Sequence, residues 1–283
     1  MDCKTIMDIV GFIIGYVGLG IGIPSLIISF FAMTSAEKAA KSANESNEKI
    51  LLNSEMTKQN TEITKELLKE LTLNSIKRGE DNESLIATYD KVNTNPQTAD
   101  DLFLKGVAKQ TKDYYEEAIE WYKKAIKLNP DFVEAYYNMG SAYRNLNGQY
   151  EKAIEYYKKA IELKPDLVEA YLNMGVAYCN WKRQYEKAID CYKKAIELKP
   201  NLAVAHLNMG VAYDDWDGQY EKAIKCYKKA IELEPDYTEA YFNMGLAYRQ
   251  KRDEKQTIGC MKKAAELGDA DAKKWLCDNN ITD

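Results

Sequence analysis

The sequence contains few of the side chains that form active sites or metal centres. It has one histidine, His206, in 283 residues, and its six cysteines form no Cys-x-x-Cys pair. No Cys/His pair, phosphate-binding loop or metal-ligand cluster accompanies that histidine. We therefore predict no catalytic residue, no metal and no cofactor. His206 is interpreted as a packing residue in a protein that is not an enzyme.

An excess of positive charge is also missing. Lysine and arginine number 39 against 44 aspartate and glutamate residues, which gives a formal net charge of −5. Because proteins that bind nucleic acid neutralise phosphates with surplus cations, this balance predicts no nucleic-acid partner. The scattered cysteines do not form a disulfide framework, so we expect free thiols, which favour a reducing compartment.

Charge is absent altogether from one long stretch near the N-terminus. Residues 9–33 contain no Asp, Glu, Lys or Arg, and about 20 apolar residues suffice to cross a bilayer. After a short flank at residues 1–8, this run predicts one transmembrane helix at 9–33, with the lipid bilayer as a partner. The alternative is a cleaved signal with small residues at 34–36 as its cleavage site, although the run exceeds the ~7–15 residues of a signal core.

Lysines around this run predict its orientation. Lys4 precedes the run, whereas Lys38, Lys41 and Lys49 follow it. Basic residues favour the cytoplasmic side of a membrane. The bias therefore predicts a single-pass membrane protein whose C-terminal bulk lies in the cytoplasm.

Small residues recur through the uncharged run at alternating spacings of four and three. This rhythm keeps them on one face of a helix. In lipid, such a face lets two backbones approach closely, so the run predicts a packing seam and a homo-oligomer. The seam residues are Gly11, Gly15, Gly18, Gly22, Ser25 and Ser29. The alternative is that these glycines only reflect the frequency of glycine in membrane helices.

A polar segment without proline or glycine follows the uncharged run. Residues 34–78 are rich in Lys, Glu, Asn, Ser and Thr, so helix propensity favours a continuous helical stalk. Polar residues interrupt the continuation of the seam, so the stalk is either a weak parallel coiled coil or an isolated solvated helix. Residues 79–98 are expected to form a linker with one short helix.

Internal repetition dominates the rest of the chain. The segments AYYNMGSAY, AYLNMGVAY, AHLNMGVAY and AYFNMGLAY recur at intervals of 35 residues. Their glycines are Gly140, Gly175, Gly210 and Gly245, and the accompanying prolines are Pro130, Pro165, Pro200 and Pro235. A period of this length predicts a stack of helix pairs in which each pair buries its apolar stripe against its neighbours.

These residues resemble the tetratricopeptide repeat (TPR) family. One full register of the family signature reads Tyr136, Met139-Gly140, Tyr143, Ala153, Tyr157, Ala160 and Pro165. The resemblance implies an all-α fold with a right-handed α-solenoid of about five repeats over residues 99–271. The expected repeats are 99–132, 133–167, 168–202, 203–237 and 238–271, followed by a capping helix and tail at 269–283.

In this family the first helix of each repeat lines a concave groove, which implies a protein or peptide ligand. The groove residues implied here are Phe103, Val107, Tyr137, Asn138, Arg144, Leu172, Asn173, Val176, Leu207, Asn208, Val211, Phe242, Asn243, Leu246 and Arg249. The asparagines form a ladder that is expected to hydrogen-bond a peptide backbone, because an amide donates and accepts at once. The alternative is that they steady the packing between repeats.

The expected function is therefore that of a membrane-anchored protein–protein interaction scaffold. The alternative is a structural or assembly protein of the cell envelope, with the TPR domain outside the cytoplasm. The two hypotheses share the solenoid and differ in the side of the membrane on which it lies.

Overall fold

The computed structural model of the chain describes residues 23–78, 83–93 and 95–281. It divides into two compact units, Met1–Leu67 and Leu68–Asp283. All regular elements in the described residues are helices, so the prediction of an all-α chain is confirmed.

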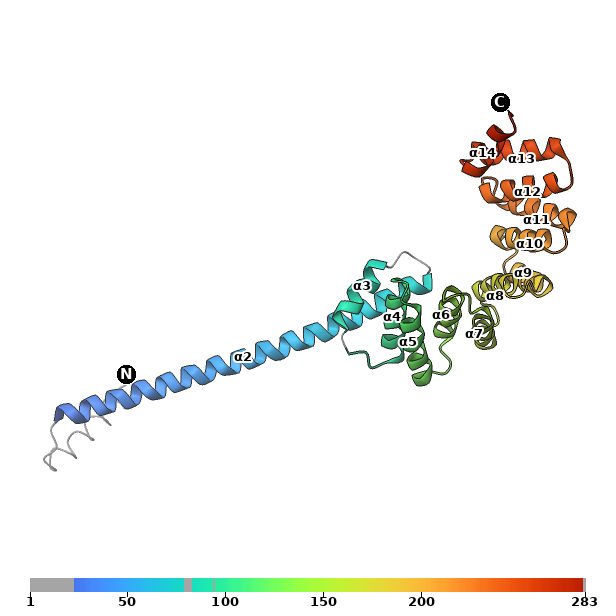
Figure 1. The fold of residues 1–283 in the computed structure, drawn as a ribbon. Helices are drawn as coiled ribbons and strands as arrows, with labels where there is room; N and C mark the ends of the chain where they lie inside the picture. Colours follow the sequence, from blue (N-terminus) through green and yellow to red (C-terminus); the bar gives the residue numbers. More distant parts are fainter. Residues whose placement is uncertain (1–22, 79–82, 94, 282–283) are drawn as a thin grey trace. The chain divides into compact units, whose positions relative to one another are not determined.

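The described part of the first unit consists of one helix. This helix, α2, spans Ile23–Arg78 and extends past the unit boundary into the second unit (Figure 1). No proline follows Pro24 within it and glycine is absent from it. The helix therefore continues through the polar residues 34–78 without a break.

Most of the predicted transmembrane helix at 9–33 lies outside the described residues. The seam positions Gly11, Gly15, Gly18 and Gly22 belong to that undescribed part, whereas Ser25 and Ser29 fall within α2. Among the helices that the structure describes, none has both the length and the apolar character needed to cross a membrane.

The second unit is a succession of helix pairs, as the 35-residue period predicts. The first (A) helices are α4 (Ala99–Gln110), α6 (Val133–Asn145), α8 (Val168–Asn180), α10 (Ala203–Asp215) and α12 (Thr238–Gln250). The second (B) helices are α5 (Tyr115–Leu128), α7 (Tyr150–Leu163), α9 (Tyr185–Leu198), α11 (Tyr220–Leu233) and α13 (Glu254–Glu266). Each of the first four B helices packs against its own A helix and against the next A helix, and α13 packs against α12 and α14 (Figure 1). The predicted solenoid of repeated helix pairs is thus confirmed.

A glycine of the A helix and a tyrosine of the B helix make the closest contact within each of the first four pairs. A Cβ atom added to Gly175 would lie 2.5 Å from Cε1 of Tyr192, far inside the ~3.5 Å that carbon atoms need. The tyrosine ring is only 2% exposed and cannot move aside. We call this contact the Gly–Tyr seam. It comprises Gly106–Tyr122, Gly140–Tyr157, Gly175–Tyr192 and Gly210–Tyr227.

Prolines mark the ends of the B helices. The first four end at Leu128, Leu163, Leu198 and Leu233, each two residues before a proline. Proline disfavours helical backbone at the residue before it, so each B helix ends where the sequence predicts.

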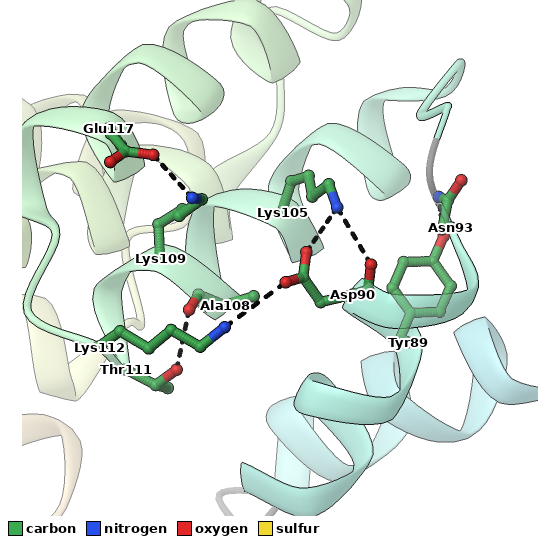
Figure 2. A network of polar contacts seen from close by, with 9 residues as sticks. All are labelled: Tyr89, Asp90, Asn93, Lys105, Ala108, Lys109, Thr111, Lys112 and Glu117. Carbon is green, nitrogen blue, oxygen red and sulfur yellow. Dashed lines mark hydrogen bonds and ion pairs between the residues drawn. The ribbon is translucent and has the colours of Figure 1, made fainter.

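A short helix, α3 (Glu83–Val92), packs against the N-terminal side of the first repeat. Its Asp90 carboxylate accepts a hydrogen bond from Lys105 Nζ at 2.6 Å and lies 3.6 Å from Lys112 Nζ (Figure 2). The buried Tyr89 hydroxyl donates to Asp101 of α4, and Asn93 Nδ2 donates to Tyr89 Oη at 2.8 Å. This network holds α3 against α4 through charge-assisted hydrogen bonds, which are stronger than neutral ones.

The core of the second unit extends upstream of residue 99. Thr72 and Ser75 of α2 are 0% and 3% exposed. Their hydroxyls donate to carbonyl oxygens of their own helix, those of Leu68 and Thr72. Because the hydroxyls are satisfied locally, these polar residues can be buried without a large penalty.

The last helix, α14 (Ala270–Asp278), lies where a capping helix is predicted. It begins at Asp269, whose carboxylate accepts from the Ala272 backbone amide at 2.7 Å. Ala272 is buried with Met261 and Ala264 of α13. Met261 occupies the place of the seam tyrosine in this last pair and leaves more room, since a Cβ on Gly245 would lie 3.0 Å from it.

Candidate protein-binding face

The A helices form a continuous side of the stack. Consecutive A helices contact one another from α4 to α12, in addition to their contacts with B helices. Four positions of each A helix point to this side, namely three and two residues before the repeat glycine, and one and four residues after it. We call these positions the A-helix face. All fifteen groove residues predicted from the sequence fall on them.

Most predicted groove residues are placed where a ligand can reach them. Arg249 is exposed, and twelve residues are half-buried. These are Val107, Tyr137, Asn138, Arg144, Leu172, Asn173, Val176, Asn208, Val211, Phe242, Asn243 and Leu246. In the last repeat, Phe242 and Leu246 also pack against the cluster of Met261 and Ala272. Val107, Tyr137, Leu172 and Val211 likewise pack against buried clusters.

Two of the predicted groove residues are core residues instead. Phe103 is 1% exposed and its ring packs against Phe132, with centroids 4.9 Å apart. Leu207 is 2% exposed and belongs to a cluster with Ala240 of the next repeat. The same helix position is therefore buried to different extents in different repeats.

The asparagine ladder is not uniform. Asn173 Nδ2 donates to Tyr137 Oη at 2.8 Å, and Asn173 Oδ1 accepts from an Arg144 guanidinium nitrogen at 2.9 Å. This asparagine joins α6 to α8, which is the packing role that the sequence left open as an alternative. Within the described residues, no such bond involves the side chains of Asn138, Asn208 or Asn243. Their amides can donate to and accept from a ligand backbone.

In the first and third repeats, the residue four positions after the repeat glycine contacts the buried tyrosine hydroxyl of the seam. The Tyr122 hydroxyl donates to Gln110 Oε1 at 2.9 Å, and the Tyr192 hydroxyl lies 3.9 Å from Cys179 Sγ. Sequence reasoning missed this pairing. A signal for it lies in the sequence, because this helix position varies between repeats whereas the tyrosine is the same in the first four.

Asp214 holds this position in the fourth repeat and is not satisfied. Its Oδ1 atom is buried and has no hydrogen-bond partner among the described residues. Burial and the neighbouring Asp215 raise the pKa of the Asp214 carboxyl. An acceptor in this state gains most from a donor that a ligand brings.

The single histidine lies beside this face on α10 and is half-buried. Burial, together with the charge of Lys229, lowers the pKa of His206. The described cysteines, Cys179, Cys191, Cys226, Cys260 and Cys277, are unpaired. Burial raises the pKa of the Cys191 thiol to about 12, so it is a poor nucleophile at neutral pH.

Stacked helix pairs with a half-exposed face define a repeat scaffold of the kind that mediates protein–protein interactions. Models of the TPR repeat match residues 113–147, 144–180, 182–214 and 217–251, and a model of the Sel1 repeat matches residues 238–269. The chain belongs to the TPR repeat proteins.

Solved structures support the same assignment. A crystal structure of MamA is 35% identical, covers 59% of this chain and 96% of its own, and superposes with a TM-score of 0.54. The portion of MamA from residue 41 to its end, from Desulfovibrio magneticus RS-1, is 28% identical over 60% of this chain and 94% of its own, with a TM-score of 0.55. YrrB, a TPR protein with an unusual peptide-binding site, shares the fold at 21% identity, a TM-score of 0.52, and coverage of 65% and 93%. No curated protein matches the chain.

Proposed function

We propose that this TPR protein is a membrane-anchored, non-catalytic scaffold that binds a protein segment on its A-helix face. The observation that supports this most directly is the state of the face on α6, α8 and α10. Val176 and Val211 are half-exposed apolar residues on successive A helices. The side-chain amide of Asn208, which lies between them, makes no hydrogen bond to another described residue. Apolar contacts beside unpaired amides suit a peptide, which offers apolar side chains and a polar backbone.

The charges on the face restrict the ligand further. Arg144 in the second repeat offers guanidinium donors beyond the one that Asn173 accepts, whereas Asp214 in the fourth repeat has an unpaired acceptor. A segment with an acidic group near the second repeat and a basic group near the fourth satisfies both. The ligand in this proposal is therefore apolar in its middle and oppositely charged at its ends.

Residues 9–33 supply the membrane anchor in this proposal. The support is the absence of charge over a length that exceeds the ~20 residues required for a membrane span. The lysines after the run favour a cytoplasmic location for the solenoid. The small-residue seam from Gly11 to Ser29 brings copies together in the bilayer.

The binding proposal is tested by adding charge at two half-buried apolar positions of the face. In Val176→Asp with Val211→Asp, two carboxylates enter the apolar part of the face. Affinity purification of the full chain from its native membranes should lose the partner that the unmodified chain retains. The matched control places the same charges on exposed B-helix positions, Lys158→Asp with Lys193→Asp, and should retain it. Equal recovery from both variants, with unchanged helicity by circular dichroism, excludes the A-helix face as the binding site.

The anchor is tested separately. Membranes washed with carbonate should keep the full chain, and a variant with Ile13→Lys and Leu19→Lys should be released from them. Release of the unmodified chain contradicts the anchor but leaves the binding face in place. An impermeant thiol reagent applied to intact cells should not label the exposed Cys277 if the solenoid is cytoplasmic.

A further inference from the structure

Four large apolar side chains form an exposed stripe along α2 in the first unit. They are Leu52, Met56, Ile63 and Leu67, and they are 52–58% exposed. At 3.6 residues per turn, their spacing places all four within an arc of roughly 60° on one side of the helix. Ile50 and Leu51 are also exposed, but they lie on other sides of the helix, and no exposed large apolar residue follows them on those sides.

The stripe has no partner within its own unit, because the described part of that unit is this one helix. A solvated helix gains nothing from large apolar residues in register, whereas association of two such helices buries them. Each of the four leaves roughly 100 Å² in water, so two copies would bury on the order of 800 Å² from these residues alone. The stems of flanking Lys and Glu side chains add to this area, which brings it near the ~1,000 Å² of a specific interface.

The charges beside the stripe select the orientation of such a pair. One edge carries Glu55, Glu62 and Glu66, and the opposite edge carries no acidic residue from Lys49 to Leu71; Glu70 lies on the side of the stripe beyond Leu67. In a parallel pair the acidic edge of one helix faces the uncharged edge of its partner. In an antiparallel pair Glu55 and Glu62 of both copies would face one another, and like charges repel. Gln59, in the middle of the stripe, fixes the register at some cost in stability.

We propose that residues 52–67 of α2 associate with the same segment of a second copy of this chain, in parallel and in register. Of the four stripe residues, only Leu67 also falls on the continuation of the small-residue seam. The stripe lies outside residues 9–33, so it provides a contact that does not require the seam within them. It also does not depend on what the A-helix face binds.

Disulfide trapping in the full-length chain tests the proposal. The exposed Cys277, the half-buried Cys179 and the N-terminal Cys3 are first replaced by serine, while the buried Cys191, Cys226 and Cys260 stay. Leu52→Cys, Met56→Cys and Leu67→Cys are then oxidised one at a time. In a parallel, in-register pair each of these residues faces the same residue of the other chain, with the two Cα atoms within the ~7 Å that a disulfide allows. Each variant should therefore form a covalent dimer.

The matched controls are Ser54→Cys and Thr61→Cys, which are equally exposed but lie on the opposite side of α2. They should remain monomeric under the same oxidation. Adding Ile63→Glu to Met56→Cys should abolish its dimer, since the new carboxylates meet across the stripe. Because all these positions are exposed on the helix surface, the substitutions should not prevent folding.

Two results overturn the proposal. Equal dimer yields from the stripe cysteines and the control cysteines mean that collisions, or contacts elsewhere in the chain, bring the copies together. A mixture of Leu52→Cys and Leu67→Cys chains that yields only mixed dimers means that the helices run antiparallel. Self-paired dimers from both variants support the parallel arrangement.

Discussion

The Gly–Tyr seam and the A-helix face lie on the same helices, yet they differ in how they change along the chain. The seam repeats the same two residue types in four successive pairs. The A-helix face varies between repeats instead. Four residues after the repeat glycine it carries Gln110, Arg144, Cys179, Asp214 and Arg249 in turn. A close-packed contact tolerates little change, whereas a half-exposed position tolerates much. The comparison indicates that the seam holds the repeats together, and the variable face is the surface that we propose binds a ligand.

The largest effect is expected from emptying the seam. Tyr192→Ala removes a ring that is 2% exposed, and we expect the free energy of unfolding to fall by about 3–5 kcal/mol. Urea denaturation followed by circular dichroism measures the loss. Tyr185→Ala, at a half-buried position on the same helix, serves as the control. A loss at Tyr185 as large as that at Tyr192 contradicts the special status of the seam.

Filling the seam should cost less than emptying it. In Gly175→Ala the new methyl group would lie 2.5 Å from the Tyr192 ring, so we expect a loss of about 1–3 kcal/mol from overpacking. Gly259→Ala is the matched control, because nothing lies within 4 Å of a Cβ there. That change should stabilise α13 by about 0.5–1 kcal/mol. Thermal unfolding of both variants should show shifts of opposite sign.

A smaller effect is expected where the face contributes to packing. Asn173→Ala removes the bonds to Tyr137 and Arg144, which should lower the free energy of unfolding by about 0.5–1.5 kcal/mol. Asn208→Ala, at the equivalent place in the next repeat, removes no internal bond and should change stability by less than about 0.5 kcal/mol. Losses of the same size in both variants would mean that the whole ladder is structural.

The smallest effect should depend on pH. The folded chain raises the pKa of Asp214 through burial and Asp215. The folded state therefore keeps this proton at pH values where the unfolded state has released it. Its favourable contribution is present below the unfolded pKa of about 3.9 and is lost as pH rises through the folded pKa. Asp214→Asn should raise the melting temperature at neutral pH and lose that advantage in acid. Asp236→Asn, at an exposed position, is the matched control.

Spacing in the sequence predicts the helix pairs well, because glycine and proline act through local geometry. The ends of the B helices follow from Pro130 and its successors, and the A–B contact follows from Gly140 and its successors. Both constraints operate within a few residues or within one helix pair. For the same reason, the sequence predicts which positions of each A helix share one face.

The parts that the sequence did not predict depend on contacts between repeats. The burial of Leu207 results from the next repeat, and the use of Asn173 results from a tyrosine and an arginine in the previous one. The core upstream of residue 99 was missed for a different reason. Thr72, Ser75 and Asn93 are buried there, and their polarity is typical of a solvated stalk or linker unless their hydrogen-bond partners are known.

Site-specific photo-crosslinking in living cells tests binding by the A-helix face most directly. A photoreactive amino acid is placed at Val176 or Val211 on the A helices, and at Lys158 or Lys193 on the B helices as controls. We expect both A-helix positions to give a crosslinked adduct with the same protein, and we expect no adduct of that mass from the B-helix positions. An adduct that forms equally from both sides, or only from the B helices, would contradict the assignment of the binding face.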